Sequence, residues 1–260
     1  IYMKQRILFF DLARCVAAIA VIAIHVLAPY RNELGTIPFG EWLTAITVNG
    51  FSRWAVPVFI LITGALMLSD KRTFDAKYYL KRRLGKVLIP FIVWSLFYTY
   101  LSGWSVMGFD AAVSWDVLLN SYHHYTYYHL GFFYYFIPLY FVIPFLQIMV
   151  RKYGDRSVYA FTAVWLFTTL LFLLKIDGPW SHELWLYTGY LPLGYLLYKM
   201  VPLNKMTVGV SVLLGGLALL TTVYMVVDAS LVAEEYTVGR WLSYKTFNTV
   251  LAASMVFMLC

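Results

Sequence analysis

The sequence predicts an integral membrane protein built as an all-α bundle of membrane-spanning helices. Of its 260 residues, 62% are hydrophobic and only 13% are charged, and the mean hydropathy is +0.71. A soluble domain carries about 25% charged residues, so this chain has too little charge to cover a surface exposed to water. The same composition argues against a disordered, fibrous or cytoplasmic soluble protein.

Eight apolar runs approach the roughly 20 residues that a helix needs to cross a bilayer. They are Ile7–Ala28, Trp42–Ser69, Leu88–Leu101, His129–Val150, Val158–Leu174, Leu184–Met200, Met206–Val227 and Thr246–Cys260. The third run is short, but Leu80–Val87 can extend it as a basic amphipathic turn at the lipid headgroups. The first run contains charged residues and no small-residue cleavage pattern follows it, so we interpret it as a membrane helix and not as a signal peptide.

We expect these runs to form a single membrane-embedded domain over residues 1–260. The last run would rise only about 22 Å as a helix, less than the roughly 30 Å of the hydrocarbon layer. No cap or charge follows Cys260, and we therefore expect the natural protein to continue beyond it. The two cysteines, Cys15 and Cys260, lie in apolar runs and support neither a disulfide nor a zinc site.

The basic residues lie mainly on one side of the predicted bundle. With the N-terminus in the cytoplasm, fourteen of the 20 lysines and arginines fall in cytoplasmic segments and four in outer segments, while Arg14 and Arg53 fall within spans. Cytoplasmic loops of membrane proteins are enriched in Lys and Arg. We therefore expect a multi-pass protein of the cell inner (plasma) membrane with its N-terminus in the cytoplasm. The net charge of +7 belongs to this face, so it gives no reason to expect nucleic-acid binding.

The first predicted helix contains three ionisable residues, Asp11, Arg14 and His25. Such groups are costly inside a bilayer unless they are paired or hydrated, and they are functional candidates for that reason. At 100° per residue, Arg14 and His25 lie about 20° apart around the helix and about 16 Å apart along it. Asp11 lies three residues before Arg14 and is its natural ion-pair partner. The pattern predicts a polar stripe that lines a cavity; the alternative is that the three side chains reach the two membrane interfaces.

The second predicted helix places Arg53 well inside the membrane. Pro57 lacks a backbone N–H, so it weakens the helix near Arg53 and frees a carbonyl there. We expect Arg53 to face the interior of the bundle. Thr63 and Gly64 follow, and two interpretations stay open for them: close packing of helices, or exposure of the backbone to a ligand.

An aromatic stretch, Tyr122–Tyr135, begins at the outer end of the fourth predicted helix. Tyrosines gather at membrane interfaces, which is one explanation, and the other is a platform for sugar rings. We expect no metal, because His123 and His124 are adjacent and would point apart on a helix. His129 differs from them because it begins the helix and faces the cavity of the bundle.

A basic segment, Lys77–Lys86, precedes the third predicted helix. It serves either to fix the orientation against anionic lipid or to bind a phosphorylated cofactor from the cytosol, since arginine makes bidentate contacts with phosphate. The residues alone do not separate these two interpretations.

Several of these motifs together resemble the membrane-bound acyltransferase 3 family. The matching segments are Phe10–Arg14 followed ten residues later by His25, then Ser52–Phe59, Phe59–Gly64, Tyr79–Leu84 with Pro90 and Phe91, and His129–Phe133. Thr63 stands where the family usually has Ser, and Gly131 stands where Trp is typical. The loop and helix pattern is most similar to the enterobacterial-common-antigen O-acetyltransferase type. Members usually have ten helices, which implies about two more spans.

The resemblance implies an enzyme that moves an acyl group, most often acetyl, from cytosolic acyl-CoA to a hydroxyl of a surface polysaccharide or lipid-linked sugar. His25 would be the general base, with Arg14 held by Asp11, and Arg53 would contact the CoA or acyl portion. The CoA phosphates would be bound by Arg82, Arg83 and Lys86. The acceptor would contact His129, Thr63 and Tyr128.

Two alternatives come from other classes of protein. A transporter or flippase would also use intramembrane Arg and His residues, although no inverted pair of Gly- or Pro-broken helices is evident. A membrane anchor or sensor module would require a large polar segment beyond Cys260. The expected partners in the first case are the lipid bilayer and a glycan or glycolipid acceptor, with acetyl-CoA as the donor and no metal.

Overall fold

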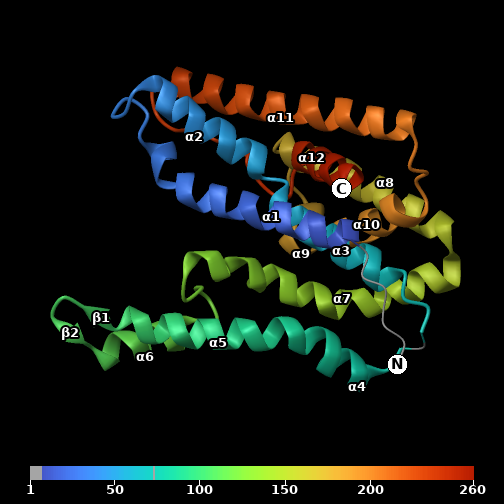
Figure 1. The fold of residues 1–260 in the computed structure, drawn as a ribbon, viewed down its shortest axis with the longest axis horizontal. Coiled ribbons are helices and arrows are strands. Elements are labelled where there is room, and N and C mark those ends of the chain that lie inside the picture. The colour runs from blue at the N-terminus through green and yellow to red at the C-terminus, as the bar shows by residue number, and fades with distance from the viewer. Residues whose placement is uncertain (1–7, 73) are drawn as a thin grey trace. The chain divides into compact units, whose positions relative to one another are not determined.

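The computed structural model describes residues 8–72 and 74–260 and is almost entirely helical in these residues (Figure 1). The chain divides into two compact units. Unit 1 comprises Ile1–Asp70 and Phe145–Cys260, and unit 2 comprises Lys71–Pro144. The predicted start at Ile7, together with the basic residues Lys4 and Arg6, lies outside the described residues.

Unit 1 contains most of the helices. They are α1 (Leu8–Leu27), η1 (Pro29–Asn32), α2 (Phe39–Ser52), α3 (Ala55–Leu68), α8 (Asp155–Leu173), η4 (Pro179–Ser181), α9 (Glu183–Thr188), α10 (Tyr190–Lys199), α11 (Lys205–Ala233) and α12 (Phe247–Leu259). Helix α7 (Gly131–Tyr153) begins in unit 2 and ends in unit 1.

Helix α3 is the most deeply buried helix of unit 1 and packs against α10, α1 and α12 (Figure 1). A Cβ atom added to Gly64 of α3 would lie 2.1 Å from the carbonyl oxygen of Leu191, and one added to Gly194 of α10 would lie 2.1 Å from that of Leu61. The two glycines therefore let the two backbones approach one another from both sides. Of the two interpretations of Gly64, the structure supports close packing.

Two helix breaks in unit 1 have the same cause. A proline has no N–H for the carbonyl four residues earlier, and its ring crowds that carbonyl. Pro57 leaves the backbone carbonyl of Arg53 without its helical partner, and α2 ends at Ser52 while α3 begins at Ala55. Pro192 acts on Thr188, and α9 ends at Thr188 while α10 begins at Tyr190. The predicted weakening of the helix near Arg53 is confirmed.

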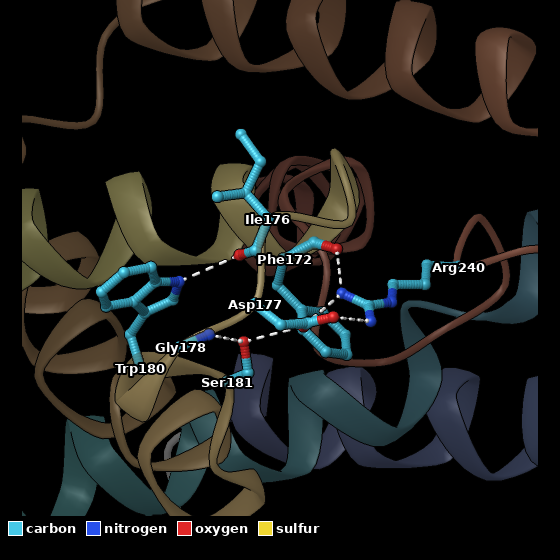
Figure 2. Close-up of polar contacts among 7 residues, drawn as sticks. All are labelled: Phe172, Ile176, Asp177, Gly178, Trp180, Ser181 and Arg240. Atoms are coloured by element: carbon cyan, nitrogen blue, oxygen red, sulfur yellow. Dashed lines mark hydrogen bonds and ion pairs between the residues drawn. The ribbon is translucent and has the colours of Figure 1, made fainter.

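A polar clamp holds the segment before α12 to the turn after α8 (Figure 2). The Arg240 guanidinium donates to both carboxylate oxygens of Asp177, at 2.8 and 2.7 Å, and to the carbonyl of Phe172 at 2.7 Å. Its Cζ atom lies 4.1 Å from the centre of the Phe172 ring. The hydrogen bonds from Arg240, and then that from Ser181, lower the pKa of Asp177, while the Asp177 carboxylate raises the pKa of Arg240. Lys245 adds an ion pair to Glu183 at 3.1 Å.

Unit 2 contains α4 (Ala76–Tyr79), η2 (Leu80–Leu84), α5 (Gly85–Ser102), the hairpin of β1 (Trp104–Ser105) and β2 (Gly108–Phe109), α6 (Ala111–Asn120), η3 (Tyr128–Leu130) and the first part of α7. The hairpin is antiparallel and pairs Trp104 with Phe109. Helices α4, η2 and α5 follow without a break, so the predicted extension of the third span is confirmed. The hairpin and α6 lie between the third and fourth predicted spans.

Six helical stretches of the described residues are long and apolar enough to cross a membrane. They are Leu8–Leu27, Phe39–Leu68, Ala76–Ser102, Tyr128–Tyr153, Asp155–Leu173 and Lys205–Ala233. The predicted count of eight is not confirmed. Residues 184–200 are divided between α9 and α10, and α12 has 13 residues. The architecture is that of a helical membrane protein.

Candidate functional site

Helix α1 presents Asp11, Arg14 and His25 along one edge of its buried stripe. The buried residues of α1 are Phe10, Ala13, Ala17, Ala20 and Ile24, spaced three or four apart as a packed helix face requires. Each of the three polar residues directly follows a buried one, so all three are rotated from the stripe in the same direction. The helix runs unbroken from Leu8 to Leu27, which keeps Arg14 and His25 in line.

Asp11 and Arg14 form the ion pair that their spacing predicts. Arg14 Nη1 lies 2.9 Å from Asp11 Oδ1, and the two side chains are 43% and 44% exposed. A pair with this exposure still reaches solvent or headgroups, which makes the charges tolerable near the end of a span. The pair therefore fixes the Arg14 side chain without sealing it away from a ligand.

Arg53 lies at the break between α2 and α3 and is held by a buried amide. Its Nε and Nη2 atoms donate to Asn49 Oδ1 at 2.9 and 2.7 Å. Asn49 is 0% exposed, and its Nδ2 atom donates to the carbonyl of Ile24 at 3.1 Å. Ile24 directly precedes His25 in the last turn of α1. One amide therefore connects the Arg53 guanidinium to the turn that carries His25.

The third contact of Arg53 comes from the segment that the clamp holds. Arg53 Nη1 donates to the Tyr244 hydroxyl at 3.3 Å, and the guanidinium carbon lies 5.3 Å from the centre of the Tyr244 ring. The backbone carbonyl of Tyr244 accepts a hydrogen bond from the Tyr190 hydroxyl at 2.6 Å. A cation over a tyrosine face is favourable, and more so away from water. Arg53 is thus fixed from two sides within unit 1.

Thr63 lies two turns beyond the break and uses its hydroxyl locally. Its Oγ1 atom donates to the carbonyl of Phe59 at 2.8 Å, within α3. The side chain is half-buried, and its oxygen retains lone pairs that can accept from a ligand.

In unit 2, Arg82 and Arg83 lie on a π-helical turn, Leu80–Leu84, at the start of the third span, and Lys86 lies in the first turn of α5. Arg82 and Lys86 are exposed, and Arg83 is half-buried. Turns of this type inside α-helices often occur at functional sites. The exposed cations suit an anionic group arriving from the solvent.

A proline in α7 creates the anchor for this basic turn. Pro144 provides no N–H to the carbonyl of Tyr140, four residues earlier. The Tyr79 hydroxyl donates to that carbonyl at 2.6 Å, and Tyr79 itself is buried. Because Tyr79 directly precedes the π-turn, this hydrogen bond fixes the start of the basic segment.

His129 and Tyr128 belong to an aromatic cluster in unit 2. The Tyr98 and Tyr127 rings are stacked with their centres 4.5 Å apart. The His129 ring meets both edge-on, with centres at 4.9 and 4.8 Å, and Tyr128 lies 5.4 Å from it. Tyr127 and Tyr128 are exposed. Exposed ring faces beside an imidazole suit the apolar faces and hydroxyls of a sugar.

The predicted site residues thus fall into two sets. Unit 1 holds Asp11, Arg14, His25, Arg53 and Thr63, and unit 2 holds Arg82, Arg83, Lys86, Tyr128 and His129. Within unit 1, the structure connects Arg53 to the His25 turn and Arg14 to Asp11. In residues 8–72 and 74–260, no group of three His, Cys, Asp or Glu side chains could hold a metal ion.

Three residues that hold Arg53 or its partners are not among the site residues predicted from the sequence: Asn49, Tyr244 and Tyr190. Asn49 carries a signal that could have identified it, since an amide in a membrane helix needs a buried partner. Tyr244 and Tyr190 carry none, because their roles depend on contacts between distant parts of the chain.

These features define a helical membrane protein whose spans carry charged and hydrogen-bonded polar side chains. The chain belongs to the acyltransferase 3 family, whose acyltransferase domain matches residues 7–260. It is therefore a membrane acyltransferase. No curated protein and no solved structure matches the chain significantly.

Proposed function

We propose that this protein transfers an acyl group, specifically acetyl, from cytosolic acetyl-CoA to a hydroxyl of a surface polysaccharide or lipid-linked sugar. The proposal follows the enterobacterial-common-antigen O-acetyltransferase type, which the chain's motifs resemble. It extends the family's acyltransferase activity to a donor, an acceptor and a set of residues.

One observation carries the proposal: the ionisable residues of α1 form a line along one edge of its buried face. His25 provides an imidazole, the side chain most often used as a general base, and Arg14 provides a cation held by Asp11 at 2.9 Å. One continuous helix therefore carries both a cation that can contact the donor and a base that can contact the acceptor. Such groups are retained inside a membrane span when they serve a substrate.

The reaction is a transfer from a thioester to an alcohol. His25 accepts the proton of the acceptor hydroxyl while the oxygen of that hydroxyl attacks the thioester carbonyl. The C–O bond forms, the C–S bond breaks, and the proton passes from His25 to the departing sulfur, so the products are an ester and free CoA thiol. Arg14 and Arg53 stabilise the negative charge that develops on the carbonyl oxygen.

The donor and the acceptor have separate recognition elements. Arg82 and Arg83 on the π-turn and Lys86 at the start of α5 bind the phosphates of CoA through charge-assisted hydrogen bonds. The acceptor is held by His129, Tyr128 and Thr63, with ring faces under the sugar. We place the N-terminus and the basic turn in the cytoplasm of a cell with an inner membrane, so that donor and acceptor approach from opposite sides.

The test of the function is transfer of label from [¹⁴C]acetyl-CoA to a glycan or glycolipid fraction in membranes that contain the full-length protein. We expect labelled sugar with the wild type and none with His25→Ala at equal amounts of folded protein. His182→Ala, which changes a histidine outside the proposed site, is the matched control and should retain activity. Full activity of His25→Ala would remove His25 from the catalytic role. Substrate movement across the membrane without any acyl donor would favour the transporter alternative.

The orientation has its own test. In a protein with Cys15→Ser and Cys260→Ser, single cysteines are introduced as Glu235→Cys or Lys81→Cys. A thiol reagent that does not cross membranes, added to intact cells, should label the first variant and not the second. The reverse pattern would contradict the proposed topology.

A further inference from the structure

Asn49 occupies a buried position that a membrane helix does not ordinarily give to an amide. The side chain is 0% exposed, within the span Phe39–Leu68, in which most residues are buried inside the protein. An amide in such a place lowers stability unless its oxygen and nitrogen both find partners. Both do so here: the oxygen accepts from Arg53, and the nitrogen donates to the backbone carbonyl of Ile24, the residue before His25.

The oxygen of Asn49 holds Arg53 by two donors of its guanidinium. Nε lies 2.9 Å and Nη2 lies 2.7 Å from Oδ1, and a bifurcated contact of this kind fixes the plane of the guanidinium group. The Tyr244 hydroxyl accepts a hydrogen bond from a third N–H, on Arg53 Nη1, at 3.3 Å. Arginine has five N–H donors. Among the described residues, three are engaged, which leaves one N–H on each terminal nitrogen for a ligand oxygen.

The nitrogen of Asn49 completes the end of α1. The last four carbonyls of a helix lack partners within it, and Ile24 carries the first of these in α1. The N–H of Ala28, which would reach the carbonyl of Ile24 in a continued helix, instead donates to the backbone carbonyl of His25 at 3.4 Å. Asn49 Nδ2 donates a hydrogen bond to the Ile24 carbonyl at 3.1 Å. The same amide therefore fixes the backbone next to His25 and the plane of Arg53.

We infer that Asn49 is a positioning residue for acyl transfer. It sets the direction of the two remaining N–H groups of Arg53 relative to the His25 turn, so that Arg53 meets the thioester oxygen of the donor while His25 meets the acceptor hydroxyl. The inference rests on the proposed function and adds to it a residue that touches neither substrate.

The test compares Asn49 with a second buried amide. Gln147 is 7% exposed and also bridges separate elements, because its Nε2 atom on α7 donates to the carbonyl of Met67 on α3 at 2.7 Å. Within the described residues, no hydrogen bond joins Gln147 to Arg53 or to the segment that carries Tyr244. Asn49→Leu and Gln147→Leu therefore both replace a buried, hydrogen-bonded amide by an apolar side chain of similar size. Both are expected to lower the melting temperature, measured on detergent-solubilised protein.

Only Asn49→Leu should reduce catalysis by folded protein. We expect kcat/KM for acetyl-CoA to fall about tenfold to a hundredfold, the range that misplacement of a catalytic group by about 1 Å produces. Gln147→Leu should stay within about threefold of the wild type per folded molecule. Equal losses for the two variants would reduce Asn49 to a structural role and overturn the inference.

A double-mutant cycle adds a readout that a purely structural residue does not change. If Asn49 acts through Arg53, then Asn49→Leu should cause little further loss in protein that already carries Arg53→Leu. Losses that multiply would contradict the inference. If Asn49→Leu does not fold, Asn49→Ser enters the same cycle. Absence of transfer by the wild type would refute the proposed function, whereas active wild type with unaffected Asn49 variants would refute only this inference.

Discussion

Arg240 and Asp177 form a two-pronged ion pair between the segment before α12 and the turn after α8, with N–O distances of 2.8 and 2.7 Å (Figure 2). The segment that Arg240 fixes also carries Tyr244, the hydroxyl partner of Arg53. A contact outside the predicted spans therefore supports an arginine inside one.

The stability of the protein should depend on pH through Asp177. Hydrogen bonds from Arg240 and Ser181 lower the pKa of Asp177 in the folded state. The contribution of the pair is therefore fully present above the ordinary carboxyl pKa of about 4 and is lost as the pH falls through the lowered value. The melting temperature of detergent-solubilised wild type should fall in this acidic window. Asp177→Asn should melt lower than the wild type at pH 7 and should lose this part of the pH dependence. Wild-type and Asp177→Asn curves that run parallel from pH 7 to the acid end would contradict the assignment.

Gly64 should not tolerate a side chain. A Cβ atom there would lie 2.1 Å from the Leu191 carbonyl oxygen, so Gly64→Ala must push α3 away from α10. We expect a loss of about 1–3 kcal/mol in the free energy of unfolding, measured by denaturation in mixed micelles. Gly216→Ala is the control, because a Cβ atom at this position of α11 meets no atom within 4 Å. It should be neutral or slightly stabilising. Equal losses for the two variants would refute the close contact.

Arg82 should recognise the phosphates of the donor. Arg82→Ala is expected to raise KM for acetyl-CoA about tenfold, equivalent to about 1.4 kcal/mol, and to leave kcat nearly unchanged. With acetyl-pantetheine, which has no phosphate, the variant and the wild type should have the same kinetics. Lys205→Gln, at the start of α11, provides a control for the general loss of positive charge. An equal effect of Arg82→Ala on both donors would exclude phosphate binding.

Tyr79 should affect the donor through the position of the basic turn. Tyr79→Phe removes the hydroxyl that donates to the Tyr140 carbonyl at 2.6 Å. We expect a loss of about 1–3 kcal/mol in stability, since a buried carbonyl loses its partner. In steady-state assays KM for acetyl-CoA should rise while KM for the acceptor stays constant. A rise in KM for the acceptor alone would contradict a role of Tyr79 in donor binding.

The stacked pair of Tyr98 and Tyr127 should support the acceptor. Tyr127→Ala removes an exposed ring face beside His129, at 4.8 Å, and is expected to raise acceptor KM severalfold without changing KM for acetyl-CoA. Trp115→Ala, which removes another exposed aromatic ring of unit 2, should change neither constant. If both variants behave alike, the tyrosines belong to a membrane-interface belt.

Local spacing was enough to predict the polar edge of α1. The interval of three residues between Asp11 and Arg14 fixes their pairing, and the period of the helix aligns Arg14 with His25. The weakness near Arg53 was equally predictable, because the effect of Pro57 acts only four residues away. The same argument applied to Pro192 would have divided the predicted span at 184–200, where the apolar composition hides the break.

The partners of Arg53 could not be predicted in the same way. Asn49 is a neighbour of Arg53 in sequence. The Ile24 carbonyl contacts Asn49, and the Tyr244 hydroxyl contacts Arg53, only through the packing of α1, α2 and the segment before α12. Hydropathy treats Asn49 as a minor interruption of an apolar run. Only the tertiary structure identifies it as the residue that joins two helices. The stacking of Tyr98 on Tyr127 is likewise a contact between separate elements.

The glycine contact between α3 and α10 also bears on how the protein is made. Helix α3 leaves the ribosome before α10 has been synthesised, so Gly64 is made without the helix whose backbone packs against it. The backbones can meet only after Gly194 has been inserted as well. For this pair, insertion and association are therefore separate events in time.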